Sequence, residues 1–81
     1  MNEADIRQAF LEELIKIAPD IDAASVGLDD HLQNDLEIDS MDFLNLVAAL
    51  HKRLGVDIPE AHYSRIATLN LATAYLVERL A

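Results

Sequence analysis

The sequence predicts an all-α fold, a small four-helix bundle in which the third helix is short. Apolar residues recur at helical spacing in the stretches expected to form helices, and no stretch alternates apolar and polar residues over the length of a strand. The chain has 81 residues and no internal repeat, so we expect a single domain over residues 1–81. A domain of this size has a thin core, which leaves little room for the deep cleft of an enzyme.

The first helix is expected over residues 3–18. Large apolar side chains recur there at intervals of three or four residues: Ile6, Phe10, Leu14 and Ile17. Asn2 can cap the start, because its side chain can accept a hydrogen bond from a free backbone N–H of the first turn. Pro19 follows the end of the helix, where the chain cannot continue as a helix.

A segment of about twenty residues, 19–39, separates the first helix from the second. A loop of that length without structure of its own is uncommon in so small a domain. Apolar residues recur along this one, so we predict a loop that is pinned repeatedly to the core and has one short helical turn. The residues expected to pin it are Ile21, Val26, Leu28, Leu32, Leu36 and Ile38.

Residues 40–54 are predicted to form the second helix. Asp39 is a suitable N-cap and Gly55 a suitable left-handed C-cap. Lys52 and Arg53 lie in the last turn, where positive charge suits the negative end of the helix dipole. The apolar residues of this segment cover more than one face, so we expect it to be the central helix, in contact with several neighbours.

The stretch VDIPEAHYSRI predicts the short third helix. Asp57 precedes it and Glu60 follows three positions later, an arrangement similar to a capping box. The fourth helix should begin near Thr68 or Asn70, because the residues after this point form one apolar stripe: Leu69, Ala72, Leu76 and Leu80.

The composition restricts the kinds of ligand that the chain can bind. It has 15 acidic and 6 basic side chains, a net charge of −9 at pH 7. Such a surface repels nucleic acid and anionic lipid, so a basic protein is the better candidate partner. The absence of cysteine excludes disulfides and thiolate metal sites. With no signal peptide and no apolar run long enough to span a membrane, we expect a cytoplasmic monomer without membrane insertion.

Ser40 is a single hydroxyl in the acidic stretch DLEIDSMDF, with no lysine or arginine within ten residues on either side. A catalytic serine needs a general base within hydrogen-bond reach. His51 would lie about 16 Å further along the same helix, and the chain has no G-x-S-x-G motif. Although His31 could approach Ser40, a hydrolase is disfavoured.

A calcium site is the second alternative, since Asp35, Glu37 and Asp39 occupy positions 1, 3 and 5 of a possible EF-hand loop. The match to the EF-hand pattern ends there, because Ser40 occupies position 6, where glycine is required, and Leu46 occupies position 12, where glutamate is required. The three histidines are not spaced as paired ligands and are expected at polar surface positions. No metal site is predicted.

A modification site is the third alternative for Ser40. As the first residue of a helix, it would lie where backbone N–H groups are unpaired and the helix dipole favours negative charge. A phosphodiester attached there would be partly stabilised against the repulsion of the adjacent carboxylates. An unmodified helix start would carry the same caps, so the local pattern alone does not choose between these possibilities.

The stretch DLEIDSMDFLNLVAALHKRLGVDIPE resembles the acyl carrier protein family, whose signature is Asp-Ser-Leu or Asp-Ser-Met at the start of the second of four helices. The resemblance extends to the amphipathic first helix, the long loop, GVDIP before the short third helix, and IATLNLATAYL in the last. It implies that Ser40 carries 4′-phosphopantetheine, transferred from coenzyme A by a separate phosphopantetheinyl transferase. The general base would then belong to the transferase, and the chain would be a carrier with no catalytic residue of its own.

By this resemblance the chain is a freestanding carrier that holds acyl intermediates as thioesters. It would deliver them to partner enzymes of a lipid or secondary-metabolite pathway, such as fatty acid or polyketide biosynthesis. The expected partners are the transferase, an acyl or aminoacyl ligase, and downstream synthase or transferase enzymes with basic docking patches. The predicted docking residues are Asp35, Glu37, Asp39, Met41 and Asp42. Met41 is equally compatible with a place in the core.

Two departures from the family pattern bear on its cargo. Glu37 stands where glycine is usual, so the backbone before the serine would be less free and the rim of the site more acidic. The later exposed turns of the second helix, acidic in housekeeping fatty-acid carriers, read Asn45, His51, Lys52 and Arg53. These residues favour a role in a dedicated pathway over one in general fatty-acid synthesis.

The Asp-Ser-Met variant also resembles carriers of D-alanine and other aminoacyl groups, which is the alternative for the cargo. An unmodified acidic adaptor is the alternative from a different functional class.

Overall fold

The computed structural model describes residues 1–81 and contains helices only. In chain order these are α1 (Glu3–Ile17), the 3₁₀ turn η1 (Ala23–Ser25), α2 (Ser40–Leu54), the 3₁₀ helix η2 (Glu60–Ile66) and α3 (Leu69–Leu80). The predicted all-α bundle is therefore confirmed, with its short third helix present as η2. The short helical turn predicted in the long loop is η1.

Local caps fix the ends of the helices. The Asn2 side chain accepts from the backbone N–H of Asp5, 2.8 Å away, and the Asp5 side chain completes a capping box with the Asn2 backbone. Asp39 caps α2 as predicted, and Gly55 ends that helix in the left-handed conformation with φ of 71°. The Thr68 hydroxyl accepts from the N–H of Leu71 at the start of α3. Asp57 does not cap η2 as expected: Pro59 stands at that position, and no side chain caps the helix.

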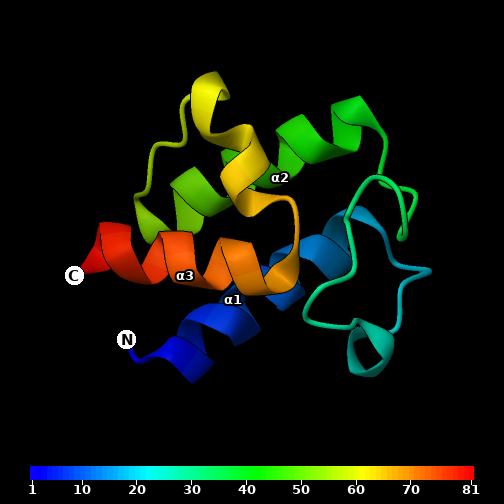
Figure 1. The fold of residues 1–81 in the computed structure, drawn as a ribbon, viewed down its shortest axis with the longest axis horizontal. Coiled ribbons are helices and arrows are strands. Elements are labelled where there is room, and N and C mark those ends of the chain that lie inside the picture. The colour runs from blue at the N-terminus through cyan, green and yellow to red at the C-terminus, as the bar shows by residue number, and fades with distance from the viewer.

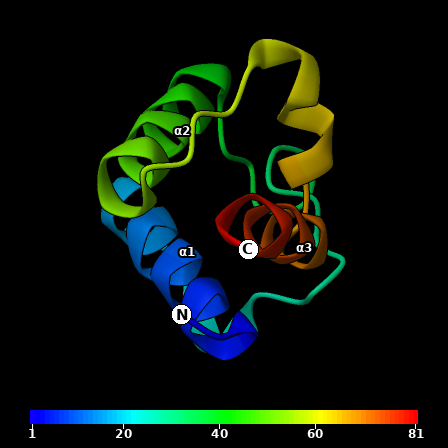
Figure 2. The ribbon, with the colours of Figure 1, turned by 90° about the vertical axis from the view of Figure 1, so that its left-hand side faces the viewer.

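In Figure 1, α1 runs in the direction opposite to α2 and α3, and Figure 2 shows α2 and α3 on different sides of the molecule. The backbone of α1 approaches both other long helices, whereas that of α2 approaches α1 and not α3. The expectation that the second helix is central was therefore wrong. Two of its surplus apolar side chains, Met41 and Leu44, remain exposed.

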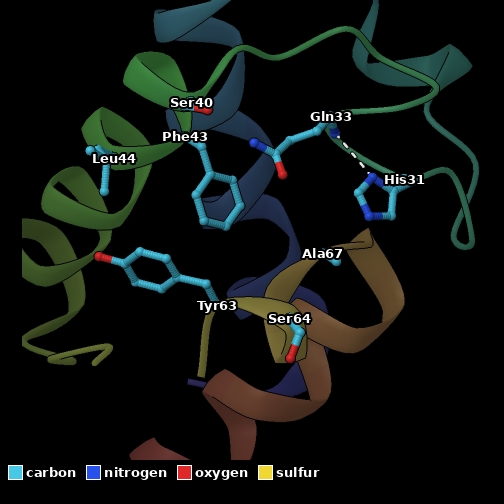
Figure 3. Close-up of a pocket in the computed structure, with 8 residues that line it drawn as sticks. All are labelled: His31, Gln33, Ser40, Phe43, Leu44, Tyr63, Ser64 and Ala67. Carbon is cyan, nitrogen blue, oxygen red and sulfur yellow. Dashed lines mark hydrogen bonds between the residues drawn. The ribbon is translucent and has the colours of Figure 1, made fainter. Parts of the chain in front are cut away.

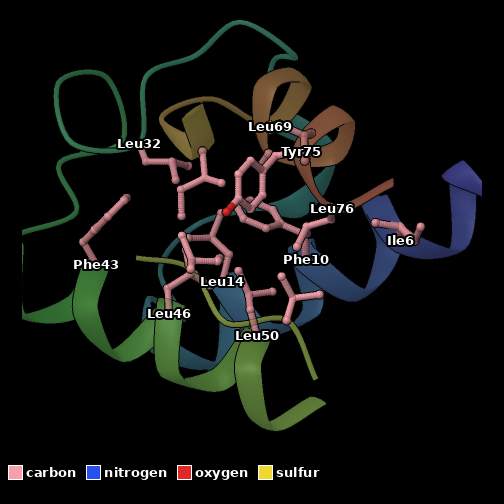
Figure 4. Close-up of a cluster of buried hydrophobic side chains, with 14 of the residues drawn as sticks. Ile6, Phe10, Leu14, Leu32, Phe43, Leu46, Leu50, Leu69, Tyr75 and Leu76 are labelled. Atoms are coloured by element: carbon pink, nitrogen blue, oxygen red, sulfur yellow. The ribbon is translucent and has the colours of Figure 1, made fainter. Parts of the chain in front are cut away.

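The core is one cluster of 15 buried side chains, much of it visible in Figure 4. The long helices supply most of the cluster, including Phe10, Leu46 and Leu76. The connecting segments add Leu32 and Ile38 before α2, and Val56 and Ile58 after it.

The long loop is anchored to the start of α3 by its backbone. The Leu32 N–H donates to the Ala67 carbonyl at 2.9 Å, and the Asn70 N–H donates to the Leu28 carbonyl at 2.8 Å. Five of the six predicted apolar anchors lie in the core or against it: Ile21, Val26, Leu32, Leu36 and Ile38. The prediction fails for Leu28, whose side chain is 49% exposed. Its backbone, rather than its side chain, anchors that part of the loop. No helix is long and apolar enough to cross a membrane.

Candidate functional site

Ser40 is the first residue of α2, and its side chain is exposed. The preceding residue sets this position, because the Asp39 carboxylate accepts a 2.8 Å hydrogen bond from the N–H of Asp42 and thereby starts the helix. Asp39 has extended backbone and Ser40 helical backbone, so the chain turns into the helix at the serine. The result is an accessible hydroxyl held on a rigid element.

The four acidic residues predicted around Ser40 lie close to it in the chain, but they have different local roles. Asp35 accepts a 2.7 Å hydrogen bond from the His31 N–H, which closes a turn of the loop. Asp39 caps α2. Glu37 is exposed and Asp42 is half-buried. Two of the four carboxylates therefore shape the backbone of the site as well as its charge.

Glu37 has a φ of +60°, and it is the only non-glycine residue of the chain with a positive φ. A Cβ is unfavourable in this left-handed region, which glycine adopts without strain. The expectation that a side chain in this place constrains the backbone before the serine agrees with this geometry.

Beside the serine, Met41 is 72% exposed and Leu44 is 51% exposed. Met41 is thus not a core residue, which removes one of the two interpretations of its sequence position. Large apolar side chains exposed next to acidic ones form a surface on which a protein partner can bury area.

A groove of about 390 Å³ begins at Ser40 and passes between α2, η2 and the long loop. Figure 3 shows its lining side chains, with Phe43 and Tyr63 next to each other on the side opposite His31. Their rings meet edge to face, with centroids 5.4 Å apart. The full lining is His31, Gln33, Ser40, Phe43, Leu44, Tyr63, Ser64 and Ala67. A volume of this size is within the range of small-ligand sites.

His31, the one histidine that the sequence left open as a base, lines the same groove as Ser40. Nδ1 of His31 accepts hydrogen bonds from the N–H groups of Gln33 and Asn34, at 3.2 and 3.1 Å. A ring nitrogen that accepts bears no proton, so the proton of the neutral ring is on Nε2. With its free lone pair committed to the backbone, His31 is not placed to activate the serine.

His31 and His62 are both partly exposed and make polar contacts, which agrees with the expected polar surface positions. His62 is half-buried, and its Nδ1 lies 2.9 Å from the Tyr75 hydroxyl and 3.0 Å from an Arg79 nitrogen. His51 is exposed as expected. No group of three or more histidine or acidic side chains is arranged to hold a metal ion.

Sequence reasoning missed the groove residues Gln33, Tyr63, Ser64 and Ala67. They come from the loop and from the η2 segment, more than twenty residues apart in the chain. The only local signal was an aromatic and a serine in a short amphipathic helix, a pattern that an ordinary surface helix shares.

At the far end of α2, Arg53 belongs to a different cluster from the one expected. It is bonded to Glu12 and Glu13 of α1, with both N–O distances 2.7 Å. Hydrogen bonds donated by Arg53 are the largest cause of the lowered pKa values of both carboxyl groups, and the same hydrogen bonds raise the pKa of Arg53. Arg53 therefore joins two helices instead of standing free on the exposed face of α2.

Comparison with known proteins places the chain in a family. A family model described as a phosphopantetheine attachment site matches residues 5–76. An acyl carrier protein of Streptomyces coelicolor is 35% identical over 96% of this chain and 88% of its own length. An acyl carrier protein of Rubrobacter xylanophilus is 31% identical over 89% of this chain and 93% of its own length. The chain therefore belongs to the acyl carrier protein family, whose members bear 4′-phosphopantetheine.

Proposed function

We propose that Ser40 is the residue that bears 4′-phosphopantetheine, and that the chain carries acyl groups for partner enzymes of a lipid or secondary-metabolite pathway. The observation that carries this proposal is the exposed hydroxyl at the first position of α2, inside the region that matches the family model. Ser25 and Ser64 are also exposed, but neither begins an α-helix.

The surroundings of Ser40 fit a tethered phosphodiester. The hydroxyl lies where the backbone N–H groups of the first helical turn are not used within the helix, and the dipole there favours negative charge. The groove that begins at Ser40 gives an attached chain an apolar surface to follow. Neighbouring carboxylates repel the phosphate and favour its outward position.

The chain supplies no base for the attachment reaction, since the lone pair of His31 Nδ1 is engaged with the backbone. The transferase must then remove the Ser40 proton. As that proton leaves, Ser40 Oγ forms a bond to the phosphorus that carries pantetheine in coenzyme A. The phosphoanhydride bond to this phosphorus breaks, and adenosine 3′,5′-bisphosphate leaves. What this chain contributes is an exposed nucleophile with a fixed position.

When bound, the prosthetic group supplies the thiol on which acyl groups are held as thioesters. The chain itself has no cysteine, so no side-chain thiol competes for the acyl group. Its own task is to present the attachment point and to bind the enzymes that load and unload it.

The surface for those enzymes is formed by Asp35, Glu37, Asp39, Met41 and Asp42. All but Asp42 are exposed, and Asp42 is half-buried. Carboxylates around an exposed apolar side chain suit partners with basic residues around an apolar pocket. Such complementarity mainly raises the association rate and depends on salt. The partners proposed are a phosphopantetheinyl transferase, an acyl or aminoacyl ligase, and downstream synthase or transferase enzymes.

The test is modification in vitro. The wild-type protein is incubated with coenzyme A, Mg²⁺ and a broad-specificity phosphopantetheinyl transferase, and its intact mass is measured. We expect a gain of one phosphopantetheine group on the wild type and on Ser25→Ala, and none on Ser40→Ala. An unmodified wild type would favour an acidic adaptor that works without a prosthetic group. An equal gain on Ser40→Ala would place the attachment elsewhere.

A further inference from the structure

Resting on the proposed function, we propose that the groove beside Ser40 selects acyl cargo that is uncharged and carries oxygen atoms along its chain. Keto- and hydroxyacyl groups belong to this class. Saturated hydrocarbon chains and aminoacyl groups do not.

The groove is lined by polar groups that have no partner within the chain. The side chains of Gln33, Tyr63 and Ser64 make no hydrogen bond to the protein, and in Figure 3 the hydroxyls of Tyr63 and Ser64 point away from Gln33. In Figure 3 the carboxamide of Gln33 extends across the groove toward Phe43. No buried side-chain polar atom of the groove lacks a partner, so these groups are hydrated when the groove is empty.

His31 adds a donor whose direction is fixed. Its Nδ1 accepts from two backbone N–H groups, which leaves the proton on Nε2. Figure 3 shows the second ring nitrogen on the side of the ring that faces Ala67. An N–H held in this way is preorganised to donate to a carbonyl or hydroxyl oxygen. The ring has no second acceptor, because Nδ1 is already bonded to the backbone.

The remaining lining decides how a carbon chain would fit. Phe43, Leu44 and Ala67 supply apolar surface, and the polar groups lie among them. A saturated chain placed here would displace water from the Gln33 carboxamide and from Nε2 of His31 without replacing its hydrogen bonds, which is unfavourable. A chain with oxygen atoms keeps the apolar contacts and also satisfies these groups.

The charge of the lining argues against an aminoacyl cargo. No carboxylate lines the groove, although acidic residues surround Ser40 in the sequence. An ammonium group entering the groove beyond the phosphodiester at Ser40 would lose water and find no carboxylate in the lining. No lysine or arginine lines the groove either, so a carboxylate-bearing cargo would be equally unpartnered.

The occupant of the groove is identified by continuity with the attachment point. Ser40 itself forms part of the lining, so the groove is within reach of a group that is tethered there. Both the tether and its cargo carry oxygen atoms, and the experiment must therefore separate the two.

The test compares four forms of the modified protein: unloaded, octanoyl, 3-oxooctanoyl and 8-aminooctanoyl. Formation of the modified protein and of each thioester is first confirmed by mass. The readouts are the urea unfolding equilibrium and the NMR resonances of the Gln33 carboxamide and the His31 ring. We expect 3-oxooctanoyl to lower the unfolding constant at least about fivefold more than octanoyl does, the effect of one additional hydrogen bond. It should also shift both sets of resonances, and 8-aminooctanoyl should do neither.

Gln33→Leu keeps the size of the side chain and removes its polar group, so it should reduce the preference for 3-oxooctanoyl. Gln8→Leu is the matched control, because Gln8 is an exposed glutamine on α1 outside this groove, and it should leave the preference unchanged.

Equal responses to octanoyl and 3-oxooctanoyl would overturn the inference. So would groove resonances that shift fully in the unloaded form, because the groove would then bind the tether and not the cargo. Failure of the proposed function would be visible earlier and separately, as the absence of any mass gain on the wild type.

Discussion

Arg53 at the end of α2 donates a 2.7 Å hydrogen bond to Glu13 in α1, a carboxylate residue that is only 7% exposed. Arg53 also donates to Glu12 at 2.7 Å, and Lys16 donates to Glu13 at 3.1 Å. One guanidinium thus bridges two carboxylates on the neighbouring helix. This bridge ties the end of α2 opposite Ser40 to α1, the helix on which α2 packs.

Replacing Arg53 with methionine should destabilise the fold at neutral pH. The substitution keeps the length and apolar stem of the side chain but leaves the buried Glu13 with Lys16 alone, and a buried charge that loses a partner is unfavourable. We expect a melting temperature several degrees lower at pH 7, measured by circular dichroism. Lys52→Met is the matched control, because Lys52 is exposed on the same helix and forms no ion pair. An equal effect of both substitutions would contradict the role of the bridge.

The contribution of this bridge should disappear in acid. Hydrogen bonds from Arg53 lower the pKa of Glu12 and Glu13 in the folded state. The stabilisation is therefore fully present above the ordinary glutamate pKa of about 4.3 and is lost as the pH falls through the lower folded values. The melting temperatures of wild type and Arg53→Met should converge below this range at constant ionic strength. A difference that stayed constant from pH 7 to pH 3 would show that packing, not charge, separates the two.

Glu37→Gly should stabilise the protein. At φ of +60° a Cβ costs about 1–2 kcal/mol, and part of the gain on removing it is offset by the greater freedom of glycine in the unfolded chain. We expect a net gain of about 0.5–1 kcal/mol in the free energy of unfolding, measured by urea titration. Glu37→Ala removes the same charge and keeps the Cβ. If alanine stabilised as much as glycine, relief of charge repulsion would be the cause.

Asp39 should affect both stability and modification, and two substitutions separate these effects. Asp39→Ala removes the cap of α2 and should cost about 1 kcal/mol of stability. Asp39→Asn keeps an acceptor for the Asp42 N–H and removes the charge, so it should leave stability nearly unchanged. If the carboxylate also steers the transferase, Asp39→Asn should lower kcat/KM for Ser40 modification at low salt, and the difference should shrink at high salt. A salt-independent loss would contradict electrostatic steering.

Tyr75→Phe should weaken the contact between η2 and α3. The Tyr75 hydroxyl lies 2.9 Å from Nδ1 of His62, and its ring packs under Arg65 and Arg79, with distances of 4.8 and 5.0 Å from the guanidinium carbons to the ring centroid. Phenylalanine keeps the ring and loses the hydrogen bond, so we expect a loss of about 1 kcal/mol by urea titration. No change would indicate that the stacked guanidinium groups alone hold this contact.

By itself, the sequence determined the helices and the place of Ser40. The bounds expected for α1, α2 and α3 agree with the structure to within about one residue, because Asn2, Asp39, Gly55 and Thr68 act on their nearest neighbours in the chain. The exposed start of α2 follows from the same short-range hydrogen bonds. Even the left-handed backbone at Glu37 had a signal in the sequence, since the family pattern has glycine there.

Tertiary structure alone decided which helix is central, how Arg53 is used and where the groove lies. A periodic apolar pattern shows that a helix buries a face but does not identify its neighbours. The surplus apolar residues of α2 therefore suggested a central helix, whereas the fold leaves Met41 and Leu44 exposed next to the serine. The groove requires Gln33 of the loop and Tyr63 of η2 to meet beside Ser40, and only long-range packing brings them together.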